Sequence, residues 1–249
     1  MSRVRLNVHE WGFASAPTIV CLHGVQASGR RFRRLAEERL VQRGYRVLGV
    51  DLRGHADSGW EPPWSIEQHV EDVVETVDGP AIWLGHSFGG RMVLEVAARH
   101  PALVQRAVLL DPALHIPPAR AFESANAERA DRSYASPEEA IAEITAEAPR
   151  TPRDILEEEV ASHLALGDDG RWRYRYAPAA VVTMFGELAR PAPPPTRCPT
   201  LVVVGEETDY VTPEHLAPLD AEVVYVPGGH RVLFEAFEET ADAVVAFLR

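Results

Sequence analysis

The sequence predicts an α/β protein with a mostly parallel, doubly wound sheet of about eight strands, helices on both faces and an inserted helical cap. Three observations carry this prediction. Short, continuous apolar runs are typical of buried strands, and they alternate with segments whose apolar residues recur at helical spacing. Residues 112–198 interrupt that alternation. We therefore expect a core formed by residues 1–111 and 199–249, with 112–198 inserted as the cap.

The predicted strands are taken in chain order, and all of them are short and rich in β-branched or aliphatic residues. They are "VRLNVHEW" (4–11), "TIVCL" (18–22), "RVLGV" (46–50), "AIWLG" (81–85), "RAVLLD" (106–111), "TLVVVG" (200–205) and "EVVYV" (222–226). Only the first strand, with the turn "WGFASAP" after it, indicates an antiparallel hairpin at the sheet edge.

Helical periodicity marks the segments between these strands and most of the insertion. In the core the predicted helices lie near 30–43, 65–77, 88–99 and 235–248, and in the cap near 119–131, 137–147 and 152–166. The cap continues with "RWRYRY" (171–176), whose aromatic side we expect to pack beneath the inserted helices. The proline-rich stretch "RPAPPPTRCP" then indicates a stiff return to the core.

Charge and composition exclude several classes of function. The formal net charge is −12, which disfavours nucleic acid and anionic membranes as partners. All 25 basic residues are arginine, so neither Schiff-base chemistry nor a Walker-type phosphate lysine is available. No apolar run approaches the roughly 20 residues of a membrane span, and the first residues do not resemble a signal peptide. We expect a cytoplasmic protein.

Metal and nucleotide motifs are missing from the sequence. There is no HExxH pattern, no cysteine–histidine cluster, and no GxGxxG after a strand. The two cysteines, Cys21 and Cys198, lie far apart in or beside apolar runs, which favours inert thiols. We expect no metal and no cofactor.

The strongest motif is "GHSFG" at residues 85–89, which follows a predicted strand and opens a predicted helix. It matches G-x-S-x-G, a turn that holds a serine in a strained conformation with its hydroxyl clear of the sheet. Glycines beside the serine avoid clashes that a Cβ would make. This context predicts that Ser87 is a nucleophile.

Here the chain resembles the α/β-hydrolase family over nearly its whole length. "CLHGVQASG" (21–29) is similar to the family's oxyanion loop, and "DLRGHADSG" (51–59) to its Asp-x-Arg-Gly-His loop, with Ala56 at a usual glycine position. "VGEETDYVTP" (204–213) resembles the loop that carries the catalytic acid, and "VPGGHRVLFE" (226–235) the loop that presents the catalytic histidine.

Nucleophilic chemistry at Ser87 requires a base and an orienting carboxylate. Among ten histidines, His230 fits the base because it follows a strand and a Gly-Gly turn. Asp209 is the first choice for the acid from its spacing to Pro213, while Asp111 in "LLDP", Glu206 and Glu207 stay open as alternatives. The resemblance implies that the N–H groups of Val25 and Phe88 are the oxyanion donors. His86 is a possible substrate-pocket residue.

The sequence therefore predicts a serine hydrolase that cleaves a small carboxylic ester, lactone or thioester through an acyl-enzyme. Its expected partner is a small-molecule ester. Within the enzyme class a C–C bond hydrolase, an acyltransferase or a cofactor-free lyase remains open. A ligand receptor that retains the triad is the alternative outside it.

Overall fold

A computed structural model describes residues 4–130 and 132–249. Its centre is a sheet of seven strands in the order β1-β3-β2-β4-β5-β9-β10. The strands are β1 (Val8–Trp11), β2 (Thr18–Leu22), β3 (Arg46–Val50), β4 (Ala81–His86), β5 (Val104–Leu110), β9 (Thr200–Gly205) and β10 (Glu222–Val226). Every predicted strand run is present, and the described residues supply one strand fewer than the about eight expected for this sheet.

Every pairing in this sheet is parallel except that of β1 with β3. The predicted hairpin between the first two strands is wrong, because β1 skips β2 and pairs antiparallel with β3. The register places Val8 opposite Val50 and Trp11 opposite Val47. The turn at residues 12–17 thus carries the chain past β3, and β2 lies inside the sheet with β3 and β4 on its two sides.

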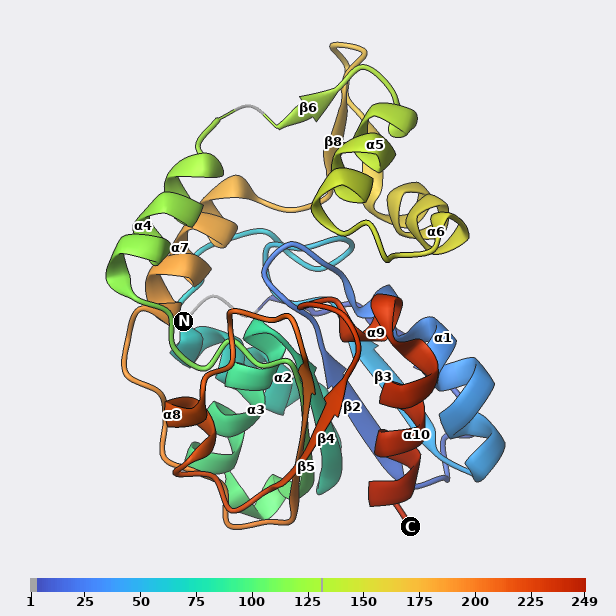
Figure 1. The fold of residues 1–249 in the computed structure, drawn as a ribbon, viewed down its shortest axis with the longest axis vertical. Helices are drawn as coiled ribbons and strands as arrows, with labels where there is room; N and C mark the ends of the chain where they lie inside the picture. The colour runs from blue at the N-terminus through green and yellow to red at the C-terminus, as the bar shows by residue number, and fades with distance from the viewer. Residues whose placement is uncertain (1–3, 131) are drawn as a thin grey trace.

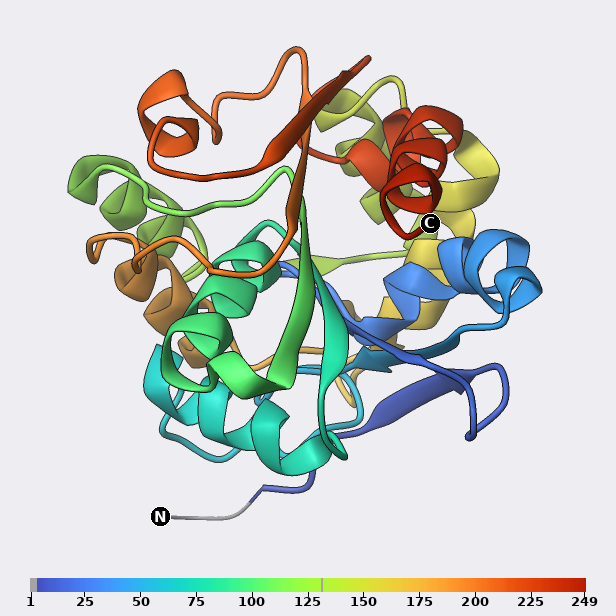
Figure 2. The same ribbon diagram turned by 90° about the horizontal axis from the view of Figure 1, so that it is seen from below.

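Helices cover both faces of the sheet, as the doubly wound prediction requires (Figures 1 and 2). One face is covered by α2 (Ile66–Thr76) and α3 (Phe88–Arg99). The other is covered by α10 (Phe237–Phe247) and by residues 29–43. The segment 29–43 is an irregular helix composed of η1 (Gly29–Phe32), α1 (Arg33–Leu35), η2 (Ala36–Leu40) and η3 (Val41–Arg43). Three shorter helices complete the core: η4 (Pro101–Leu103), α8 (Pro213–Leu216) and α9 (Val232–Glu235).

The helix α2 illustrates how the sequence specifies these elements. Ser65 caps its first turn, because the hydroxyl accepts a hydrogen bond from the N–H of Gln68 at 3.3 Å. Ile66, Val70 and Val73 then recur at helical spacing and are fully buried against the sheet. The other flanking helices likewise pack their apolar side against the sheet.

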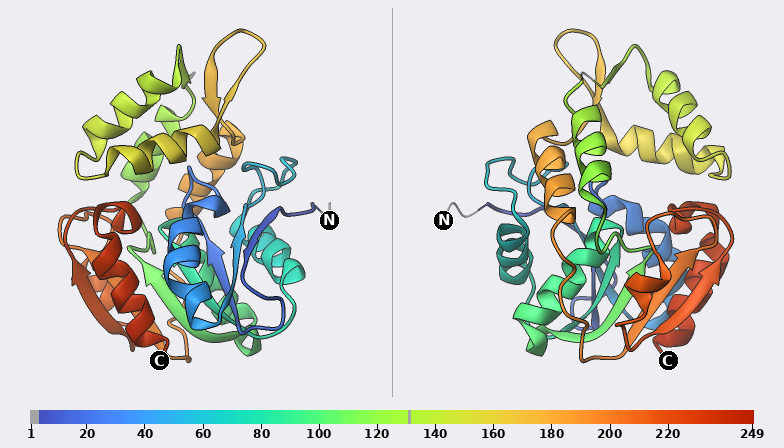
Figure 3. Two further views of the ribbon diagram at one scale, coloured as in Figure 1. Left: turned by 90° about the vertical axis from the view of Figure 1, so that its right-hand side faces the viewer. Right: turned by 60° about the vertical axis from the view of Figure 1, so that its left-hand side comes forward.

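Residues 112–198, the inserted segment, leave the sheet after β5 and return to it at β9. These two strands are hydrogen-bonded neighbours, so the segment begins and ends at adjacent positions of the sheet. The views of Figures 1 and 3 place it above the carboxyl ends of the strands. Its elements are α4 (Pro118–Ala127), β6 (Ser133–Tyr134), α5 (Pro137–Glu147), α6 (Arg153–His163), β7 (Leu164–Leu166), β8 (Trp172–Tyr174) and α7 (Pro178–Leu188).

Parts of the inserted segment differ from the prediction. The aromatic run contributes β8, which pairs with β6 and β7 in a small antiparallel sheet that the periodicity did not indicate. Trp172 and Tyr174 pack against the apolar cluster of α5 and α6. The helix α7 was not predicted, and residue 131, within the first predicted cap helix, lies outside the described residues. No helix in the described part of the chain is long and apolar enough to cross a membrane.

Candidate active site

Ser87 lies at a sharp turn between β4 and α3. Its backbone φ and ψ are 55° and −119°, a conformation that is energetically costly for any residue except glycine. Two backbone hydrogen bonds join the turn to the last residue of β5 and to the segment just after it. The N–H of Ser87 donates to the carbonyl of Leu110 at 3.1 Å, and the N–H of Ala113 donates to the carbonyl of Ser87 at 3.0 Å. The end of β5 therefore fixes the strained serine.

The glycines of the motif allow α3 to approach the sheet closely. A Cβ at Gly89 would lie 1.9 Å from the carbonyl oxygen of Leu22, and one at Gly85 would lie 2.1 Å from the carbonyl oxygen of Gly89. Both contacts are to backbone atoms, which cannot move aside as the end of a side chain can. The turn requires glycine at both positions.

We expect Gly89→Ala to lower the free energy of unfolding by about 3 kcal/mol or more, because the added methyl group forces α3 away from β2. Urea denaturation measures the change. The matched control is Gly186→Ala in α7, where a Cβ would meet nothing within 4 Å. This exposed helical position should gain about 0.5–1 kcal/mol instead. Equal stability of the two variants would contradict the close packing described for the turn.

His230 lies in the loop after β10 and contacts the carboxylate of Asp111. The ring Nδ1 is 2.5 Å from Asp111 Oδ2. Asp111 is fully buried at the end of β5, with a positive φ of 41°. Its carboxylate also accepts hydrogen bonds from the N–H of Gly205 at 2.9 Å and from the hydroxyl of Thr208 at 2.6 Å. This geometry makes Nδ1 the protonated nitrogen of the neutral ring and leaves Nε2 as the basic one.

The structure does not bring Asp209 to His230. The Asp209 carboxylate instead accepts a hydrogen bond from Arg120 of α4 at 2.9 Å, and its side chain is 74% exposed. The prediction relied on the spacing of Asp209 to Pro213 within the loop. The preceding residue, Thr208, does face the site, and its hydroxyl donates a hydrogen bond to the carboxylate of Asp111. The acid contact with His230 therefore belongs to the alternative at the end of β5.

The two expected oxyanion donors belong to residues close to Ser87. Phe88 is the first residue of α3, and Val25 follows a glycine that packs against the serine: a Cβ at Gly24 would lie 3.4 Å from Ser87 Oγ. The His23 ring accepts from the N–H of Leu52 at 2.9 Å, so its Nδ1 carries the proton and donates to the carbonyl of Gly24 at 2.7 Å. Because N–H and C=O point in opposite directions across a trans peptide, this contact also orients the N–H of Val25.

His86 forms part of the wall beside the proposed base. Its Nε2 donates to the carbonyl of His230 at 2.8 Å, and the two ring centroids are 4.9 Å apart. Burial, followed by the charge of His230, lowers the pKa of His86 well below its ordinary value. The ring is therefore neutral, and its Nδ1 is a buried acceptor without a hydrogen-bond partner. His86 also lines the small cavity that contains Ser87.

A cavity of about 120 Å³ joins these residues beneath the inserted segment. The core contributes Ser87, His230, His86 and the loop at 24–26, while Phe185 and Leu188 of α7 contribute apolar wall. The volume is small beside the roughly 300–1,000 Å³ of typical ligand pockets. The cavity therefore favours a short group next to the serine. Among the residues that the structure describes, no cluster of three or more histidine, cysteine or acidic side chains is arranged to hold a metal ion.

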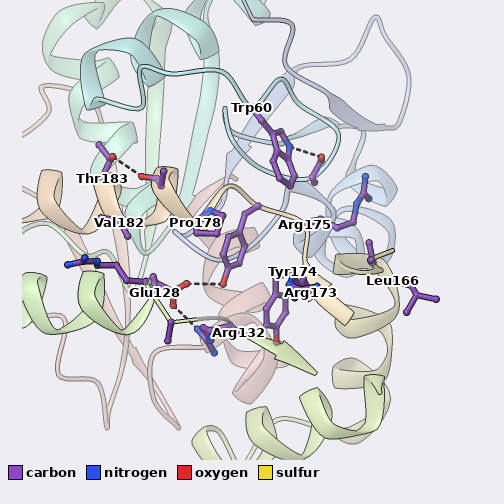
Figure 4. A pocket seen from close by; sticks show the side chains of 17 residues that line it. Trp60, Glu128, Arg132, Leu166, Arg173, Tyr174, Arg175, Pro178, Val182 and Thr183 are labelled. Atoms are coloured by element: carbon purple, nitrogen blue, oxygen red, sulfur yellow. Dashed lines mark hydrogen bonds and ion pairs between the residues drawn. The ribbon is translucent and has the colours of Figure 1, made fainter. Parts of the chain in front are cut away.

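A second, larger cavity of about 1010 Å³ lies between the inserted segment and the loop that carries Trp60 (Figure 4). Arg132 and Tyr174 line both cavities. Glu128 at the end of α4 links the two regions, because its carboxylate accepts hydrogen bonds from Arg132 and from Gln26 beside the Val25 loop. The larger cavity offers room for the part of a ligand that the small one cannot hold.

Comparison with known proteins gives the family. The model of the alpha/beta hydrolase family matches residues 19–246, from β2 to the last helix. The chain is an alpha/beta hydrolase. The order of Ser87, Asp111 and His230 along this alpha/beta hydrolase is the order serine, acid, histidine that is usual for the fold.

Several characterised alpha/beta hydrolases are similar to this chain. Lipase LipV of Mycobacterium tuberculosis is 34% identical over 225 residues, covering 87% of this chain and 85% of the lipase. The sn-1-specific diacylglycerol lipase ABHD11 of Mus musculus is 28% identical, with 95% and 82% of the two chains covered. The crystal structure of E-2-(acetamidomethylene)succinate hydrolase superposes with a TM-score of 0.85 at 25% identity, covering 99% of this chain and 96% of that one.

Sequence reasoning missed several residues that contact the predicted ones. Tyr210 stacks on the His230 ring with centroids 4.0 Å apart, and Thr208 donates to Asp111. Arg31, in the helical segment 29–43, and Arg231, which directly follows His230, also line the small cavity. Asp111 was not missed, because "LLDP" places an acid directly after a buried strand and kept it as an alternative. Thr208, Tyr210 and Arg231 lie in loops that resemble family motifs, but those motifs gave them no role.

Proposed function

We propose that this alpha/beta hydrolase cleaves a small carboxylic ester, lactone or thioester through an acyl-enzyme on Ser87. The observation that carries the proposal is the 2.5 Å contact between His230 Nδ1 and buried Asp111, with His230 and Ser87 lining one cavity. The named lipases among the relatives support an ester as the substrate class. The small volume beside Ser87 supports a short acyl group.

In this mechanism Ser87 Oγ attacks the carbonyl carbon while Nε2 of His230 takes the hydroxyl proton. The buried carboxylate of Asp111 keeps the ring in the required tautomer and stabilises the imidazolium that forms. The N–H groups of Val25 and Phe88 donate to the oxyanion of the tetrahedral intermediate. The imidazolium then protonates the leaving alcohol or thiol. Water, deprotonated by the same ring, releases the acid and restores Ser87.

We further propose that residues 112–198 act as a cap over a core of residues 1–111 and 199–249. The cap supplies Phe185, Leu188 and the rim of the large cavity, whereas every proposed reacting residue belongs to the core. This division assigns substrate selection mainly to the cap and bond cleavage to the core.

The test is turnover of p-nitrophenyl esters of graded acyl length, followed by release of p-nitrophenol. Acetate and butyrate esters should be hydrolysed with multiple turnovers, and the rate should fall for long acyl chains because the cavity beside Ser87 is small. Mass spectrometry of a quenched reaction should detect the acyl group on Ser87. A single burst without further turnover on every ester would instead support a receptor that retains the triad.

A further inference from the structure

The wall of the small cavity contains an unusual number of charged groups for a site that cleaves a neutral ester bond. Three arginines line it: Arg31, Arg132 and Arg231. Two carboxylates, Glu147 and Glu159, line it as well. Whether this wall attracts an anion depends on how completely each arginine is neutralised by its own partners.

Arg132 is fully neutralised. Its guanidinium donates to Glu128 at 2.7 Å and to Glu143 at 2.8 Å, so two carboxylates share one cation. Arg31 is neutralised by one carboxylate but keeps spare donor capacity. Its Nη2 donates to Glu159 at 2.6 Å, while its Nε is buried and has no hydrogen-bond partner.

Arg231 has the longest ion pair of the three arginines that line the cavity. It directly follows His230, and its side chain is 26% exposed. The nearest carboxylate, Glu147, is 3.5 Å away and 56% exposed, a geometry in which an ion pair contributes little. No hydrogen bond joins the Arg231 guanidinium to another residue in the described part of the chain. Burial, followed by the charge of Arg31, lowers the pKa of Arg231, although the charges of Glu159 and Glu147 act to raise it.

We propose that the substrate carries a carboxylate, which binds between Arg231 and Arg31 beside the carbonyl that Ser87 attacks. This inference rests on the proposed hydrolase function and names its substrate class. A guanidinium presents a planar pair of donors that matches the two oxygens of a carboxylate. The cavity volume of about 120 Å³ limits the charged group to a short one.

The test compares esters of similar size of which one carries a carboxylate and the other does not. Monomethyl succinate is matched by methyl 4-oxopentanoate, which replaces the carboxylate by an acetyl group of similar size. Acetoxyacetate is matched by its methyl ester. This second pair tests a carboxylate that belongs to the leaving group instead of the acyl group. We expect wild-type kcat/KM to favour the charged member of at least one pair by about ten- to hundredfold. Acid release is followed by titration at constant pH, and for the acetoxyacetate pair the acetate formed is measured, because the methyl ester contains a second ester bond.

The decisive variant is Arg231→Gln, which removes the charge and keeps a hydrogen-bonding side chain. The ratio of kcat/KM for the charged and the neutral ester should fall by about tenfold or more. Arg153→Gln is the matched control, because Arg153 is 70% exposed on α6 and does not line the cavity. That variant should keep the wild-type ratio. In the wild type, succinate should inhibit hydrolysis of the neutral ester competitively, whereas succinamide should not, and this measurement needs no variant.

The inference is overturned if the wild type hydrolyses the neutral member of each pair as well as the charged one. It is also overturned if Arg231→Gln leaves the ratio unchanged, or if succinate and succinamide inhibit equally. Reaction of Ser87 with a fluorophosphonate separates this failure from that of the proposed function. A protein that is labelled and hydrolyses neutral esters retains the function without the carboxylate site. A protein that is not labelled by the fluorophosphonate and hydrolyses no ester lacks both the proposed function and the carboxylate site.

Discussion

Asp111→Asn should lower kcat for a short ester by about 10³- to 10⁴-fold, while Asp209→Asn should change it by less than about threefold. An asparagine at 111 can still accept from the N–H of Gly205 through its amide oxygen. Its NH₂ group then faces Nδ1 of His230, which forces the proton onto Nε2 and removes the base. Steady-state kinetics of both variants measure the effect.

Asp209 is the matched control for this experiment because it lies in the loop that the sequence favoured. Its carboxylate bonds to Arg120 on the protein surface, so its removal costs only an exposed ion pair. Denaturation midpoints of both variants should accompany the kinetics, since Asp111 also supports Thr208 and Gly205. If the two variants exchange phenotypes, the loop at 205–213 carries the acid and the proposed triad is wrong.

Ser87→Ala should lower ester turnover by at least about 10⁴-fold and abolish labelling by a fluorophosphonate. The residual rate arises from substrate binding and from the oxyanion donors, which the substitution leaves in place. The fold should persist, because the hydrogen bonds that hold the turn involve the backbone of residue 87 and not its hydroxyl. Rapid-quench mass spectrometry should find no acyl group on this variant.

Ser124→Ala on α4 provides the serine control. This residue does not line either cavity, and its loss should leave turnover within about twofold of the wild type. Turnover by Ser87→Ala within tenfold of the wild type would show that another residue performs the attack.

The nucleophile could be predicted from the sequence because its signal is local. Gly85, Ser87 and Gly89 lie within five residues, and the two glycines themselves indicate the tight, strained turn. The acid is different. Asp111 and His230 meet across 119 positions of sequence, and whether a strand end or a neighbouring loop reaches the ring depends on sheet geometry. Spacing to a proline within the loop carries no information on that geometry.

The same distinction explains the errors in the fold. The buried strands have continuous apolar runs, and each of them was predicted. The partner of β1 was not predicted, because the residue pattern of an edge strand is the same whether it pairs with β2 or with β3. The helix α7 begins at Pro178 and packs Val181 and Met184 into the main core. Its neighbouring prolines indicate a loop, although a proline at the first helical position favours a helix start.

The adjacency of β5 and β9 also has a consequence for how the chain folds. Pairing these strands closes a loop of about 90 residues, and loop-closure entropy grows only slowly with length, so the insertion costs little equilibrium stability. Its kinetic cost is larger, because non-local parallel pairing is intrinsically slow. Ser87 and Asp111 belong to the early, consecutive strands, whereas His230 lies on the part of the chain that must wait for this closure. We therefore expect refolding to restore native fluorescence of Trp83, buried in β4, before it restores catalysis.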